Sequence, residues 1–221
     1  FNDTPANFGR IATQTAKQTM MQRLRMAEKE MIYDEYKDRA GAIVSGTVRR
    51  FEKSDVLVDL GKFEGRIPSR GRVVTEDYNI GDRIRVYVVA VENETRGPEI
   101  ILSRSHPNFV RRLFESEVAE IADNTVELRG IAREAGYRTK VAVASNDDKV
   151  DPVGACVGLR GARVKNIVRE LNNEKVDIIR WSTDIREFVT DALKPAQIRS
   201  IQINEEDHRI SITVDEEELS K

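Results

Sequence analysis

The sequence has few of the residues that build covalent cross-links or metal centres. It contains one cysteine and two histidines among 221 residues. A single cysteine cannot form a disulfide within the chain, which excludes a disulfide-stabilised scaffold and favours a reducing compartment, the cytoplasm. No histidines and cysteines have the spacing of a zinc site. We therefore expect no metal and no cofactor.

Long hydrophobic runs are also missing. No stretch approaches the ~18 to 20 consecutive apolar residues that a membrane-spanning helix needs, and no basic start followed by an apolar run marks a signal peptide. We therefore expect no association with a membrane. The sequence begins with Phe1 in a polar stretch rather than with Met, so we expect it to be part of a longer protein.

Positive charge is concentrated in one part of the chain. The formal net charge of −2 argues against a uniformly basic nucleic-acid binder. Residues 129–175 nevertheless contain ten Lys or Arg and six Asp or Glu, whereas residues 204–221 contain two and seven. Because affinity for phosphate depends on where cations cluster, residues 129–175 are the candidate binding segment. The overall charge pattern favours a monomer.

The first segment has helical periodicity. Residues 8–36 contain no proline and place Met20, Leu24, Ala27 and Met31 three or four positions apart, which predicts one long helix. Its other faces are charged. It is therefore either a solvated connector with a narrow apolar seam or a helix that binds a partner.

The pattern then changes to period two, punctuated by glycines, which predicts short strands. The predicted strands are residues 43–51, 56–60, 66–68, 84–90 and 99–103. Five strands in so short a segment are typical of a small OB barrel, and Gly41, Gly46 and Gly65 make it resemble the S1 type. Such barrels bind single strands through aromatic side chains. Phe51 and Phe63 are the candidates for stacking on bases, the alternative being that they fill the barrel core.

A third segment follows the order of a type II KH module. After a helix from residue 106 come strands at 126–134 and 138–144, a glycine-rich stretch at 154–161, a helix with its apolar face at Val164, Ile167 and Leu171, and a strand at 175–181. Residues 184–214 begin the same order again, and the sequence ends before a second glycine loop. The fold class is therefore α+β and multidomain.

The glycine loop carries the chemistry. Gly-x-x-Gly between two helices, here Gly158 to Gly161, is the KH signature, because glycines let backbone N–H groups approach phosphates closely and the following helix adds its dipole. The alternative is a structural turn that caps a helix. Val164 is a further candidate for the apolar groove. The residues expected to contact single-stranded RNA are Val157, Gly158, Leu159, Arg160, Gly161, Ala162, Arg163, Lys165 and Ile178.

Catalysis has no support in the sequence. Neither His106 nor His208 is placed near Cys156 by any motif for nucleophilic catalysis, and Cys156 lies between small apolar residues, as a buried cysteine does. We expect a protein that is not an enzyme. Two alternatives stay open: the accessory RNA-binding region of an RNA-processing or RNA-degrading enzyme, and a protein-interaction scaffold whose KH fold binds no RNA.

Several longer motifs make the chain resemble the NusA family of bacterial transcription termination and antitermination factors. They lie at residues 8–18, 81–88, 102–104, 132–143 and 193–196, and above all in DPVGACVGLRGARV at 151–164. The resemblance implies a non-enzymatic factor that binds RNA polymerase and nascent RNA and modulates pausing, termination and antitermination. It also implies four segments: a connecting helix that ends an N-terminal domain (1–37), an S1-type barrel (38–105), a first KH module (106–182) and a truncated second KH module (183–221).

Overall fold

The structure is a computed structural model that describes residues 6–94, 97–204 and 206–218. The chain forms two compact units. The first contains residues 1–73 and 77–109, and the second contains residues 74–76 and 110–221. No helix in the described part of the chain is long and apolar enough to cross a lipid bilayer.

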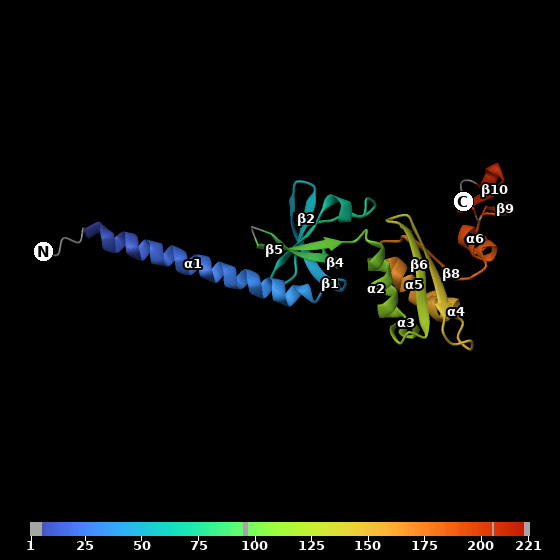
Figure 1. The fold of residues 1–221 in the computed structure, drawn as a ribbon, viewed down its shortest axis with the longest axis horizontal. Coiled ribbons are helices and arrows are strands. Elements are labelled where there is room, and N and C mark those ends of the chain that lie inside the picture. Colours follow the sequence, from blue (N-terminus) through green and yellow to red (C-terminus); the bar gives the residue numbers. More distant parts are fainter. Residues whose placement is uncertain (1–5, 95–96, 205, 219–221) are drawn as a thin grey trace. The chain divides into compact units, whose positions relative to one another are not determined.

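The first unit begins with a single long helix, α1 (Ala6–Lys37), as the sequence predicted (Figure 1). Its predicted apolar seam is exposed, since Met20, Leu24 and Met31 are each more than half accessible. Its last turns are different. Tyr36 is buried in the core of the barrel that follows, and Ile32 packs against the same core. The end of α1 is therefore part of the barrel's structure.

Five strands close into a barrel in the order β1-β2-β3-β5-β4, which confirms the predicted fold. Their bounds are β1 Ile43–Glu52, β2 Asp55–Asp59, β3 Glu64–Ile67, β4 Arg83–Glu94 and β5 Gly97–Ser103, with a 3-10 turn η1 at Ser69–Gly71. All pairs are antiparallel except β3 with β5. Strand β4 is longer than predicted because its polar end continues to pair with β5, as in Glu92 opposite Glu99.

The barrel core consists of alternate residues from all five strands. These are Val48, Val56, Val58, Ile67, Val86, Val88, Ile100 and Leu102. Each is at most 1% exposed. Burial of a Val, Leu or Ile side chain contributes about 1.5–3 kcal/mol, so this set drives the folding of the unit.

The second unit follows the predicted order of a KH module, except that the helix predicted from residue 106 is divided in two at Val118, whose backbone is extended. Its elements are α2 Pro107–Glu117, α3 Ala119–Ala122, β6 Val126–Glu134, β7 Arg138–Ser145, α4 Pro152–Val157, η2 Leu159–Gly161, α5 Ala162–Glu170 and β8 Lys175–Arg180. Strand β7 pairs antiparallel with β6 and parallel with β8. Helices α3, α4 and α5 contact this sheet (Figure 1). Trp181 lies just beyond β8, although its N–H still donates to Val143 O at 2.8 Å.

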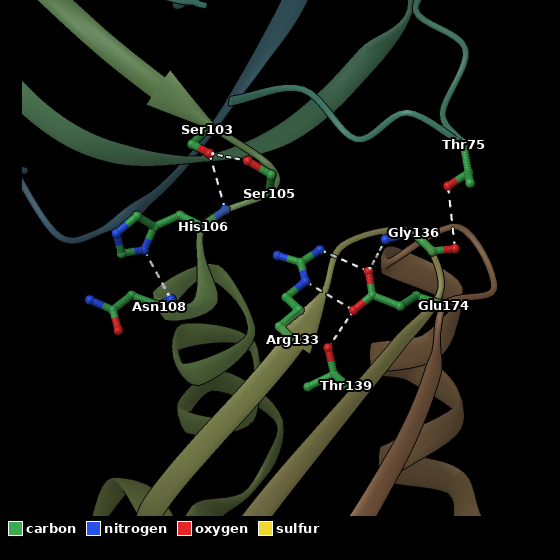
Figure 2. Close-up of polar contacts among 9 residues, drawn as sticks. All are labelled: Thr75, Ser103, Ser105, His106, Asn108, Arg133, Gly136, Thr139 and Glu174. Atoms are coloured by element: carbon green, nitrogen blue, oxygen red, sulfur yellow. Dashed lines mark hydrogen bonds and ion pairs between the residues drawn. The ribbon is translucent and has the colours of Figure 1, made fainter. Parts of the chain in front are cut away.

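A buried ion pair fixes one end of this sheet. The side chains of Arg133 in β6 and Glu174, next to β8, are 1% and 0% exposed. Two guanidinium N–H groups donate to the carboxylate at 2.9 Å, and Gly136 N–H donates at 2.7 Å. Thr139 Oγ1 donates to the same carboxylate (Figure 2). Burial by itself would raise the pKa of Glu174, but these hydrogen bonds outweigh it and hold the pKa below its usual range.

The last elements repeat the start of a KH module. They are α6 Ile185–Leu193, β9 Ile198–Asn204, β10 Arg209–Val214 and a 3-10 turn η3 at Glu216–Glu218. Strands β9 and β10 are antiparallel, with Ile201 opposite Ile212 and Ile203 opposite Ile210. Ile210 and Ile212 are 43% and 38% exposed. This pair of strands therefore has a far less buried apolar face than the first KH sheet.

Candidate nucleic-acid interface

Helix α4 leads the chain into the predicted loop. Asp151 caps its first turn, with Oδ2 accepting from Gly154 N–H at 3.0 Å, and Pro152 occupies the first helical position, where no N–H is needed. The other carboxylate oxygen of Asp151 pairs with Arg180 Nη2 at 2.7 Å. The helix ends at Gly158, whose N–H donates to Gly154 O at 2.9 Å. A short, capped helix therefore fixes where the loop begins.

Three of the four loop residues have a positive φ. Gly158 has φ 72° and ψ 176°, Arg160 has φ 55° and ψ 24°, and Gly161 has φ 76° and ψ 17°. The Gly158 conformation is essentially restricted to glycine, whereas that of Gly161 is the αL region. Helix α5 follows at once, and Gly161 supplies no side-chain acceptor for its first amides. The positive end of α5 is thus suited to an anion.

The centre of the loop faces solvent. Leu159 is 86% exposed, and Arg160 and Ala162 are exposed as well. Within the described ranges, no hydrogen bond or ion pair involves the guanidinium of Arg160. The exposed Leu159 and the uncompensated Arg160 lie next to the start of α5, where Ala162 N–H donates to Leu159 O and no described side chain caps the amides that follow. Such a surface fits a nucleotide backbone with its base.

Two other cations that were expected to contact RNA, Arg163 and Lys165, make contacts within the protein. Arg163 Nη1 donates to Glu120 Oε2 at 2.7 Å and to Ala155 O at 2.6 Å. Lys165 Nζ donates to Arg160 O at 3.2 Å. These cations could be predicted from the sequence but their partners could not, because nothing in the local pattern links Glu120 to Arg163.

Apolar side chains flank the loop on helix and strand. Val157 at the end of α4, Val164 in α5 and Ile178 in β8 are all half-buried, and both helices contact β8. Cys156 is fully buried. Burial, with a smaller effect of Glu120, raises the pKa of its thiol to about 12, so it is a poor nucleophile. Among the described residues, no group of three metal-ligating side chains comes together.

The two aromatic candidates of the barrel differ in their surroundings. Phe51, at the end of β1, is 43% exposed. Phe63 is half-buried against the barrel core, with its ring edge-on to Tyr36 at 5.6 Å between centroids. These contacts favour the packing interpretation for Phe63. Stacking on a base stays a prediction for Phe51.

Comparison with known proteins yields four family models along the chain. They are the NusA N-terminal domain at residues 1–30, the S1 RNA binding domain at 37–105, the NusA-like first KH domain at 104–181 and the NusA-like second KH domain at 185–221.

Similar curated proteins carry the name transcription termination/antitermination protein NusA. The Bacillus subtilis protein is 48% identical over 217 residues, which are 98% of this chain and 58% of the relative. The Thermus thermophilus protein is 42% identical in an alignment of 223 positions that covers 100% of this chain and 58% of the relative. A Mycobacterium tuberculosis protein is 45% identical in an alignment of 222 positions that covers 97% of this chain and 64% of the relative. The chain therefore spans less than two thirds of the length of these relatives.

Proposed function

Since the chain belongs to the NusA family of transcription termination and antitermination proteins, we propose that it binds single-stranded RNA through the loop from Gly158 to Gly161. Leu159 and Arg160 contact the RNA directly. Backbone amides later in the first turn of α5 hold a phosphate, and Val157, Val164 and Ile178 supply the apolar surface beside it.

A single observation carries this proposal. In the part of the chain that the structure describes, the loop combines two glycines at positive φ, an Arg160 guanidinium without a partner, and the start of a nine-residue helix that has no side-chain cap. A turn that merely ended α4 would need only Gly158. The second glycine, with its left-handed backbone at the start of α5, and Leu159, which is 86% exposed, both fit a site where a nucleotide backbone approaches the protein closely.

The wider proposal is that RNA polymerase is the second partner, so that the protein modulates pausing, termination and antitermination of nascent transcripts. The names of the relatives support it. The protein would then act in the cytoplasm as a monomer. The division into residues 1–37, 38–105, 106–182 and 183–221 has the support of the family-model matches.

Titration of a fluorescent single-stranded RNA with the double variant Leu159→Asp, Arg160→Asp tests the RNA site. A matched control, Val74→Asp with Lys175→Asp, makes the same change in net charge at two exposed positions of the same unit. We expect the first variant to lose RNA binding and the control to keep most of it, with unchanged circular dichroism in both. Equal losses in the two folded variants would contradict a site at the loop.

The polymerase proposal needs a separate experiment. The immobilised chain is incubated with purified bacterial RNA polymerase after nuclease treatment, and the bound polymerase is quantified. We expect polymerase to be retained equally by the wild type and by the Leu159→Asp, Arg160→Asp variant, because the proposal assigns the loop to RNA and not to polymerase. Absence of retention by both would contradict direct association of this chain with polymerase.

A further inference from the structure

Arg163 is joined to the predicted RNA loop from two sides. Its Nη1 donates both to Ala155 O in α4, at 2.6 Å, and to Glu120 Oε2 in α3, at 2.7 Å. One guanidinium nitrogen therefore links the helix before the loop to a third helix. Hydrogen bonds between charged groups are short and roughly twice as strong as neutral ones, so this contact holds the side chain in one place.

The aliphatic part of the same side chain lies against Gly158. A Cβ placed on Gly158 would be 2.8 Å from Arg163 Cγ, 3.0 Å from Cδ and 3.2 Å from Cβ. The stem of Arg163 thus packs directly on the backbone of the first loop glycine. Movement of Arg163 would remove the packing contact between its side chain and the Gly158 backbone.

The charge of Arg163 is already compensated. Its carboxylate partner is at ion-pair distance, and both side chains are about one-third exposed. Arg160 differs, because its guanidinium has no such partner in the described ranges. A phosphate would have to compete with Glu120 for Arg163, but for Arg160 with no group among the residues that the structure describes.

We propose that Arg163 is a positioning residue, which holds the loop in its left-handed conformation by linking Ala155 to Glu120, and is not a phosphate ligand. The role rests on the proposed RNA function of the loop. Lys165 also holds the loop backbone in place, since its amine donates to Arg160 O at 3.2 Å. Arg160 is then the cation of the loop that meets the phosphate.

The dependence of RNA affinity on salt concentration distinguishes a phosphate ligand, as proposed for Arg160, from a positioning residue, as proposed for Arg163. Each phosphate contact to a single strand contributes about 0.7 to the slope of log K against log salt. We expect Arg160→Gln to make the slope shallower by about 0.7. We expect Arg163→Gln to weaken binding about tenfold with the slope unchanged, as for the loss of a charged hydrogen bond. Arg163→Lys, which keeps one donor group, should restore part of the affinity.

Glu120→Gln gives the sharpest contrast. If Arg163 were a phosphate ligand, removal of the carboxylate would free it and strengthen RNA binding. A positioning role predicts the opposite, weaker binding, although the variant removes a negative charge. Stronger binding by Glu120→Gln, or a shallower slope for Arg163→Gln, would overturn the proposal.

Amide hydrogen exchange of the RNA-free protein tests the positioning role of Arg163 independently of RNA. The Gly158 and Gly161 amides donate to Gly154 O and Gly158 O, so we expect both to exchange faster in Arg163→Gln, with the urea unfolding midpoint little changed. Unchanged exchange of the Gly158 and Gly161 amides would refute the positioning role of Arg163 even if the protein binds RNA. If Arg163→Gln exchanged faster but the wild type bound no RNA, the positioning role of Arg163 would stand and only the proposed function would be refuted.

Discussion

Replacement of Gly158 by alanine should be among the most damaging single-methyl changes in the KH module. The backbone there has φ 72° and ψ 176°, a conformation that costs other residues on the order of 1–3 kcal/mol. The new methyl group would also lie 2.8 Å from Arg163 Cγ, so Arg163 must shift from its two hydrogen bonds. Overpacking of this kind costs typically 1–3 kcal/mol. We expect a total loss of about 3 kcal/mol.

Gly161→Ala is the matched control. Its backbone has φ 76° and ψ 17°, the αL region, which costs a residue with a Cβ roughly 1–2 kcal/mol. The nearest atom to the new methyl would be Lys165 Cε, at 3.7 Å, an ordinary contact. We therefore expect a loss of about 1 kcal/mol, and a difference of about 2 kcal/mol between the two variants.

Urea unfolding followed by tryptophan fluorescence measures this difference. The chain has one tryptophan, Trp181, whose backbone N–H bonds to Val143 in the KH sheet, so the signal reports on the module of interest. With a slope of about 2 kcal/mol per molar urea, the unfolding midpoint of Gly158→Ala should lie about 1 M below that of Gly161→Ala. Equal midpoints, or the reverse order, would refute the account of the loop backbone.

Three further predictions concern other parts of the chain. Phe63→Ala should lower the free energy of unfolding of the barrel by roughly 2–3 kcal/mol, because Phe63 packs on Tyr36. Phe51→Ala should instead leave the free energy of unfolding nearly unchanged and weaken RNA binding by about 1 kcal/mol. Unfolding and RNA titrations of both variants that gave the reverse effects would contradict a packing role for Phe63 and a stacking role for Phe51. Glu174→Gln should cost about 3–5 kcal/mol at pH 7, since it leaves the buried Arg133 without its counter-ion. In the folded protein the pKa of Glu174 is lowered from 4.5, so its contribution to stability is complete above that pH and is lost as the pH falls through the lowered pKa. The urea midpoints of the wild type and of Glu174→Gln should therefore converge in acid. A difference between the midpoints that did not change with pH would contradict this dependence. Cys156, with its pKa raised to about 12 by burial, should react with iodoacetamide at pH 8 only after unfolding in urea, and rapid labelling of the native protein would show that the thiol is accessible.

Local patterns were sufficient to predict the elements and their order. The period of three to four in residues 8–36, the alternation in 84–90 and the Gly158–Gly161 loop each reflect interactions within one helix, strand or turn, and the structure has α1, β4 and η2 at these places. Such patterns arise because each element must bury one face. The OB and KH folds then followed from the number and order of the elements.

Contacts between distant residues could not be predicted in this way. Arg133 and Glu174 are 41 positions apart, and Glu120 and Arg163 are 43 apart. No periodicity connects such pairs, so Arg163 was predicted from its charge alone to contact phosphate. Strand alternation from Val126 and Leu128 would place Arg133 on the opposite face, and only an irregularity between Leu128 and Gly130, which the sequence pattern does not reveal, brings Arg133 opposite Thr139.

The central claim is that RNA binds at the loop between α4 and α5. The most direct test is a titration of the isotopically labelled protein with a short single-stranded RNA, followed by two-dimensional amide NMR. We expect the largest shift changes at residues 158–165, with further changes at Val157 and Ile178. Changes confined to other surfaces, with the amides of Gly158 and Gly161 unaffected at saturation, would contradict the claim.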